Sequence, residues 1–107
     1  MVTIDMLIDI LEQNDMKYTS TGNFSGEIEF YSPLGEDVVL DLDYTSNSIV
    51  ESFISLYESF DAEEHAAMWI NSRGTNGVPD SIRDLLEDAE WIESKLGYIA
   101  RELNNVK

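Results

Sequence analysis

The sequence has 107 residues, 43% of them apolar, which suffices for one domain over residues 1–107 but not for two. Its 22 acidic and 6 basic residues give a formal net charge of −16, which argues against direct binding to nucleic acid or to an anionic membrane surface. The absence of cysteine excludes disulfides and thiolate metal sites, and no apolar run approaches the roughly 20 residues of a membrane-spanning helix.

The first predicted element is an amphipathic helix over residues 3–14. Thr3 is placed to cap its N-terminus, and its apolar residues recur at helical spacing: Ile4, Leu7, Ile8 and Leu11. Asp5 and Asp9 interrupt the apolar stretch and no basic segment precedes it, so we do not expect a secretory signal peptide.

Alternating apolar and polar residues predict three antiparallel strands between residues 17 and 44. The apolar residues of the central hairpin fall on one face: Ile28, Phe30, Val38, Leu40 and Leu42. A tight turn is predicted over Ser32-Pro33-Leu34-Gly35, because proline fixes φ and glycine is favoured at the end of such a turn. Residues 17–23 are the third and more polar strand.

Three helices are predicted to follow the sheet. Ser48 with Glu51, and Asp61 with Glu64, are spaced as capping boxes at the start of two of them. A loop around Pro79 leads to the longest helix, whose apolar residues recur in steps of three and four: Ile82, Leu85, Ala89, Ile92, Leu96, Ile99 and Leu103. This apolar seam suits packing along another helix, so a structural or oligomerising module is one possible class of protein.

The predicted fold class is therefore α+β: an N-terminal helix, a small three-stranded antiparallel sheet, and then three helices that cover one face of the sheet. The expected core draws on both layers: Ile28, Leu40, Phe53, Phe60 and Trp69. Gly97 interrupts the last helix, which indicates either close packing against a neighbour or local fraying.

Few residues could support catalysis. His65 is the single histidine, and neither a cysteine nor a G-x-S-x-G motif accompanies it, so we do not expect an enzyme. Asp61 and His65 stand one helical turn apart, but two ligands are too few for a metal site, and we expect neither a metal nor a cofactor. We interpret His65 as a surface residue in the first turn of its helix.

The acidic residues are concentrated in residues 1–72, which contain 15 of them against one basic residue, Lys17. Four carboxylates are predicted on the outer face of the hairpin, the first two across from the last two: Glu27, Glu29, Asp41 and Asp43. Like charges that oppose each other across a sheet cost a few tenths to about 1 kcal/mol per pair. Asp15, Glu36 and Asp37 extend this acidic strip. Taken alone, the two aspartates would also fit a divalent cation site or plain solvent exposure.

Three explanations of the strip remain open. An adaptation to high salt would spread the charge over the whole chain, whereas residues 73–107 contain seven acidic and five basic residues. An acidic immunity or antitoxin-like protein would use the strip to bind a basic nuclease toxin, with electrostatic steering of the encounter. A DNA mimic would present carboxylates in place of phosphates to a nucleic-acid-binding protein.

Two segments carry a family resemblance. Residues 4–8 read I-D-x-L-I and are followed by Asp15 and Gly22, and residues 48–57, after the hairpin, read S-I-V-E-x-F-I-S-x-Y. This pattern resembles the small prophage-encoded anti-CRISPR proteins that block the RNA-guided DNA nuclease of type II systems. The resemblance covers residues 4–60, and the S-I-V-E-x-F-I-S run is its most specific part.

The resemblance implies a protein that occupies the site where the nuclease recognises the PAM duplex, in the cytoplasm of a bacterial host. Contacts are then expected from an acid after the first helix, which is Asp15 in this chain, and from the hairpin turn at Gly35, Glu36 and Asp37. Leu34 departs from the polar residue expected beside the glycine.

A third group of contacts is implied near the last helix, and Glu63 and Glu64 fit it. From residue 60 onward this chain is longer than such inhibitors and ends in a helical pair. Asp41 and Asp43 complete the expected contact surface. The expected function is non-enzymatic inhibition of a basic nucleic-acid-binding protein, without a cofactor, and the immunity or antitoxin-like function is the alternative.

Overall fold

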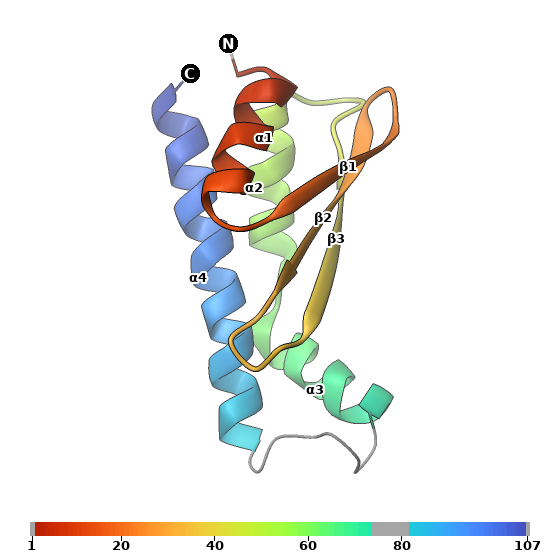
Figure 1. The fold of residues 1–107 in the computed structure, drawn as a ribbon, viewed down its shortest axis with the longest axis vertical. Helices are drawn as coiled ribbons and strands as arrows, with labels where there is room; N and C mark the ends of the chain where they lie inside the picture. Colours follow the sequence, from red (N-terminus) through yellow and green to blue (C-terminus); the bar gives the residue numbers. More distant parts are fainter. Residues whose placement is uncertain (1, 74–81, 107) are drawn as a thin grey trace.

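The computed structural model describes residues 2–73 and 82–106. Figure 1 shows the elements in chain order: α1 (Ile4–Gln13), β1 (Lys17–Gly22), β2 (Ser25–Tyr31), β3 (Asp37–Asp43), α2 (Ile49–Ser59), α3 (Ala62–Arg73) and α4 (Ile82–Val106). This is the predicted α+β arrangement of a helix, a three-stranded antiparallel sheet and three further helices. The loop predicted around Pro79 lies outside the described residues.

Local hydrogen bonds fix both ends of α1. The Thr3 hydroxyl oxygen accepts the Met6 N–H at 3.3 Å, so the predicted cap is confirmed. At the other end the Met16 N–H donates to the Leu11 carbonyl oxygen at 2.9 Å, as in a Schellman motif. Asp15 supplies the left-handed residue of this motif, with φ 60°. The chain reverses there and enters β1.

The three strands pair in their sequence order, β1-β2-β3, and all pairs are antiparallel. Ile28 in the central strand lies opposite Tyr18 in β1 and Leu40 in β3. The turn between β2 and β3 closes with a 2.8 Å hydrogen bond from the Gly35 N–H to the Ser32 carbonyl oxygen. Gly35 has φ 86°, a left-handed conformation that glycine adopts without strain.

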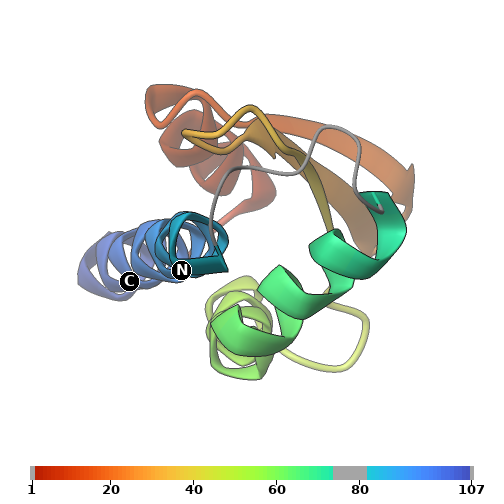
Figure 2. The same cartoon turned by 90° about the horizontal axis from the view of Figure 1, so that it is seen from below.

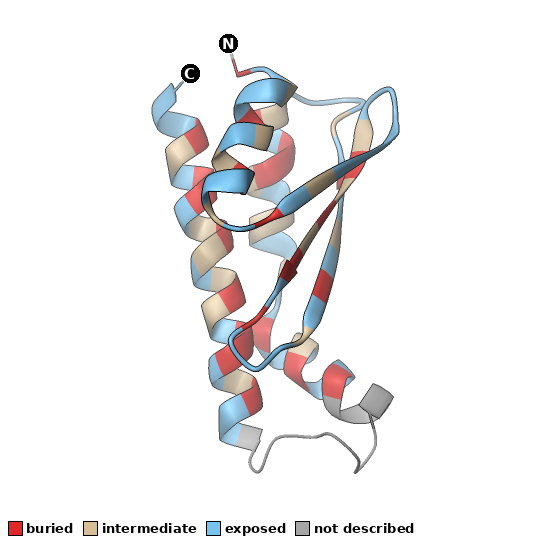
Figure 3. Cartoon of the chain, in the orientation of Figure 1, coloured by how far each residue is buried: buried red, intermediate tan, exposed pale blue. Residues whose placement is uncertain are grey.

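Helices cover one face of the sheet, which we call the inner face. Seen from below in Figure 2, the strands lie on one side, and α2 and α4 lie on the other. Figure 3 shows buried positions along the strands. The buried inner-face residues of the hairpin are Ile28, Phe30, Val38 and Leu42. They share one core with Leu7 and Leu11 of α1 and with Phe53 of α2. Leu40 and Phe60, both predicted core residues, are only half-buried at its edge.

A second, smaller core joins α3 to the first half of α4. Its buried residues are mostly small: Ala62, Ala66, Trp69, Leu85 and Ala89. Trp69 is therefore buried as predicted, but it packs in this second core and not against the sheet.

The apolar seam of α4 is buried within the chain. Ile92, Leu96, Ile99 and Leu103 have no exposed surface, because they pack in the main core with α1, α2 and the sheet. A side chain at Gly97 would begin 3.1 Å from the Tyr57 ring, so this glycine permits close packing of α4 on α2. The seam therefore packs against other elements of the same chain, and it gives no separate support to an oligomerising module.

The predicted capping boxes also form at their first residues. The Ser48 hydroxyl oxygen accepts the Glu51 N–H at 3.1 Å, and Asp61 accepts the N–H groups of Glu63 and Glu64 at 3.0 and 3.2 Å. Within the described ranges, none of the helices is both long enough and apolar enough to span a membrane.

Candidate functional site

The face of the sheet opposite the helices is acidic, and we call it the outer sheet face. Its carboxylates come from alternate residues of two strands: Glu27, Glu29, Asp37, Asp41 and Asp43. Glu27 lies directly across from Asp41, as predicted. Two neighbouring carboxylates therefore face each other without a helix above them.

The predicted pairing is wrong at the other two acids. Glu29 lies opposite Val39, with Lys17 of β1 on its other side, and Asp43 lies opposite Ser25. The register follows from the turn length, which sequence alternation alone does not specify because it defines the face and not the partner. The outer sheet face thus contains one directly opposed acidic pair, flanked by further carboxylates.

The outer sheet face contains little compensating positive charge. Lys17 is the single basic residue in the three strands. Among the described residues, no lysine or arginine forms an ion pair with Glu27, Asp41 or Asp43. Tyr31 and Val39 are 69% and 49% exposed on this face, so it also offers apolar surface, of a kind that is common in protein interfaces.

Asp43 has a local role at the end of β3. The Thr45 side chain and its backbone N–H both donate hydrogen bonds to this carboxylate, and they hold the pKa of Asp43 below its usual range. The carboxylate accepts the Thr45 N–H at 2.9 Å, which is an Asx turn. Asp43 therefore keeps its charge to a lower pH than an ordinary aspartate, and it also shapes the chain that leaves the sheet.

A contact to α4 and a hydrogen bond within the turn hold the hairpin turn in place. The Leu34 N–H donates to the Asp88 carboxylate of α4 at 3.0 Å, across 54 residues of sequence. The Glu36 N–H donates to the Ser32 hydroxyl oxygen, also at 3.0 Å. The predicted contact residue Gly35 is exposed at the tip of this turn. The backbone of the turn is therefore anchored before any partner binds.

The interpretation of His65 as a surface residue is wrong. Its side chain is only 20% exposed, and its Nε2 lies 2.9 and 3.0 Å from the two carboxylate oxygens of Glu36, which is itself 13% exposed. The Phe60 ring packs beside the imidazole, with ring centroids 5.2 Å apart. The pairing joins α3 to the hairpin turn, and local sequence could not reveal it because the two residues are 29 positions apart.

The Glu36 contact changes how the predicted turn residues are ranked. Glu36 is largely enclosed and already has a partner, whereas its neighbour Asp37 is exposed at the start of β3. Asp37 is thus the more accessible carboxylate of the predicted pair.

The other predicted contact residues belong to elements outside the three strands. Asp15 is exposed at the corner between α1 and β1, where its left-handed backbone terminates the helix. Glu63 and Glu64 are exposed in the first turn of α3, where carboxylates also favour the helix N-terminus. The predicted contact residues therefore come from three parts of the fold: the outer sheet face with the hairpin turn, the α1–β1 corner and the first turn of α3.

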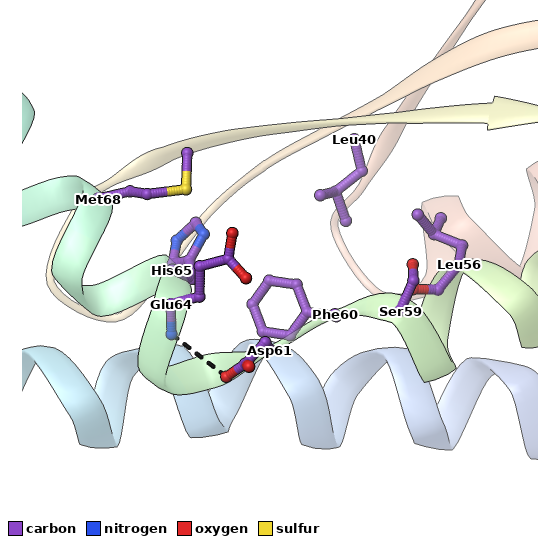
Figure 4. Close-up of a pocket in the computed structure, with 8 residues that line it drawn as sticks. All are labelled: Leu40, Leu56, Ser59, Phe60, Asp61, Glu64, His65 and Met68. Carbon is purple, nitrogen blue, oxygen red and sulfur yellow. Dashed lines mark hydrogen bonds between the residues drawn. The ribbon is translucent and has the colours of Figure 1, made fainter.

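A hollow that sequence reasoning missed lies between β3 and the α2–α3 corner. Figure 4 shows its lining, in which apolar and polar side chains are mixed and Glu64 and His65 lie at one end: Leu40, Leu56, Ser59, Phe60, Asp61, Glu64, His65 and Met68. Met68 is 61% exposed there. The weak separation of apolar and polar residues in α3 was the available signal that this helix leaves apolar groups uncovered.

A metal site has no support in the described part of the chain, where no three His, Asp or Glu side chains gather in a way that could hold an ion. Asp41 and Asp43 are both exposed on the outer sheet face.

Comparison of the chain with known protein families, with curated proteins and with solved structures finds no significant match. The resemblance to anti-CRISPR proteins rests on the residues quoted above alone.

Proposed function

We propose that this chain is a non-enzymatic inhibitor that presents its outer sheet face to the basic, nucleic-acid-binding surface of another protein. The observation that carries the proposal is the open pair Glu27–Asp41, with Asp37 and Asp43 beside it and no lysine or arginine paired to any of the four within the described residues. Such an arrangement is unfavourable for the isolated fold, and a cationic partner would relieve it.

Carboxylates on this face can bind the same cationic side chains that bind phosphates. Arginine and lysine bind both groups through charge-assisted hydrogen bonds, and arginine does so with two parallel bonds. Outward residues two positions apart on a strand lie roughly 7 Å from each other, which allows several cationic side chains to bind at once. Exposed Tyr31 and Val39 would add apolar contact between the charges.

The partner class follows from the resemblance. An RNA-guided DNA nuclease of type II reads its PAM with arginine side chains in the major groove, so an acidic competitor suits that site. The proposed setting is the cytoplasm of a bacterial host, and the activity requires no cofactor.

A competition experiment tests the proposal. The chain is titrated into a type II nuclease loaded with guide RNA, with and without a DNA duplex that contains the PAM, and the bound fraction is measured. We expect the duplex to displace the chain, and the affinity to fall at least about tenfold between about 50 and about 200 mM salt. If neither the duplex nor the salt concentration changed the affinity of the chain for the nuclease, mimicry of DNA would be contradicted.

A variant pair locates the contact surface. Glu27→Gln with Asp41→Asn removes two charges from the outer sheet face, and Asp9→Asn with Glu12→Gln removes two exposed charges from α1. We expect the first pair to weaken nuclease binding much more than the second. Equal weakening would indicate a net-charge effect without a defined surface.

The same experiment separates the alternative function. An acidic immunity or antitoxin-like protein would bind a basic nuclease toxin in the absence of guide RNA, and a PAM duplex would not compete specifically. Asp37 is the suitable turn residue for charge reversal, since reversal at Glu36 would also break its contact with His65.

A further inference from the structure

A second hollow lies on the other side of the hairpin turn, between the turn and α4. Its volume is about 250 Å³, and residues of the turn and of the first half of α4 line it: Pro33, Leu34, Asp84, Glu87, Asp88 and Trp91. The anti-CRISPR resemblance does not include this part of α4, because it ends near residue 60. The hollow thus needs its own explanation.

Asp88 is the unusual group in this hollow. Its side chain is only 3% exposed, and one carboxylate oxygen, Oδ1, accepts the Leu34 N–H at 3.0 Å. The other, Oδ2, is buried and has no hydrogen-bond partner among residues 2–73 and 82–106. An unpartnered buried carboxylate oxygen destabilises a fold, since neither water nor protein replaces its lost hydration. A cationic ligand would supply the missing donor.

The surrounding groups favour a cation that is flat and organic. Asp84 and Glu87 are exposed carboxylates four residues and one residue before Asp88 on the same helix, so the local charge is negative. Trp91 forms an aromatic wall, and this chain's own Lys95 ammonium already lies 5.8 Å from the centre of its ring. Within the described residues no three carboxylates gather around a metal position.

A guanidinium group matches these features better than an ammonium. It is planar, it stacks on aromatic rings, and its N–H groups form a fork that fits carboxylates. Apolar Pro33 and Leu34 would pack along the methylene groups of an arginine side chain.

We propose that the hollow between the β2–β3 turn and α4 binds the guanidinium group of an arginine side chain on a partner protein, with Asp88 Oδ2 as an acceptor. The identity of that protein rests on the function proposed above, whereas the affinity of the hollow for guanidinium does not.

The test titrates the isolated chain with N-acetyl-arginine N-methylamide and follows amide and indole signals by NMR. We expect saturable shifts at the Leu34 amide and the Trp91 indole, which lie at the hollow. The matched citrulline derivative has nearly the same shape without the charge, and it should leave both signals in place. Equal shifts from both compounds, or no saturable shift, would overturn the proposal.

Asp88→Asn is the decisive variant, because asparagine keeps an oxygen acceptor for the Leu34 N–H and loses the charge. We expect it to weaken binding of the arginine derivative about tenfold or more. If this variant does not fold, Glu87→Gln on the exposed rim should weaken binding several-fold, while Asp9→Asn on α1 should have no effect. Unchanged binding in the folded rim variant would overturn the proposal.

Free arginine distinguishes a metabolite site from a protein contact. Free arginine adds an α-ammonium and an α-carboxylate, which a residue within a protein chain lacks, so we expect free arginine to bind no more tightly than the blocked derivative. Tighter binding of free arginine would overturn the assignment to a protein side chain. The NMR titration contains no nuclease, so its result does not depend on the proposed function. If the chain failed to inhibit a nuclease in a separate assay, the proposed function would be contradicted and the guanidinium result would stand.

Discussion

Alternate residues of the same strands form two sheet faces with different roles: the inner face is packed beneath the helices, and the outer face is acidic and faces away from them. On the inner face, Ile28 and Leu42 are 0% and 2% exposed beneath the helices. On the outer face, Glu27 opposes Asp41 without a helix above them. We therefore expect the fold and the acidic surface to be separable, so that each face can be changed with little effect on the other.

The magnitudes explain why the chain tolerates such a surface. Burial of a large aliphatic or aromatic side chain stabilises a fold by about 1.5–3 kcal/mol, whereas one opposed like-charge pair costs at most about 1 kcal/mol. The inner face therefore outweighs the repulsion on the outer face.

The largest expected effect is on the inner face. Ile28→Ala should lower the free energy of unfolding by about 2–5 kcal/mol, because Ile28 is fully buried and its truncation leaves a cavity. Urea denaturation should show a lower midpoint with an unchanged slope. A loss below about 1 kcal/mol would mean that the inner face is not the main source of stability.

A smaller inner-face effect is expected at Gly26, over which the Tyr18 ring packs. A side chain at this position would collide with the ring, so Gly26→Ala should cost about 1–3 kcal/mol. Thermal unfolding of Gly26→Ala, Tyr18→Ala and the double variant measures the coupling. Additive effects of the two substitutions would contradict direct contact as the cause.

On the outer face the expected sign is opposite. Glu27→Gln should leave the fold intact and raise the free energy of unfolding by a few tenths of a kcal/mol, because it removes repulsion from Asp41. The gain should shrink at high salt, where charges are screened. Destabilisation of this variant would show that Glu27 supports the fold, and it would break the separation between the two faces.

The smallest expected effect is at alkaline pH. Burial raises the pKa of Tyr18 from its usual value of 10.0 to about 12, and the nearby Tyr44 hydroxyl contributes to this shift. Among the described residues, the Tyr18 hydroxyl has no hydrogen-bond partner of normal geometry. The folded state thus favours the neutral ring, and this stabilisation is complete below pH 10 and is lost as the pH rises toward 12. The unfolding temperature of Tyr18→Phe should therefore fall less than that of the parent chain as the pH rises from 10 to about 12.

Much of the architecture could be predicted from the sequence because it depends on neighbours in the chain. Thr3, Ser48 and Asp61 cap helices through donors within three residues, and strand alternation assigns each residue to a face. The left-handed role of Asp15 was not predicted, although an aspartate tolerates that conformation better than most residues do.

The candidate site was only partly predictable. Sequence alternation put the acids on one face, but the register that pairs Glu29 with Val39 depends on how the turn closes.

Composition, periodicity and caps by themselves determined that this chain is acidic and has an α+β fold with an apolar and a charged sheet face. The tertiary structure alone decided that Glu36 would join His65, that Asp88 would hold the turn at Leu34, and that the α4 seam would be buried within the monomer. The physical reason is distance along the chain: these contacts join residues many positions apart, and they exist only after the helices have packed on the sheet.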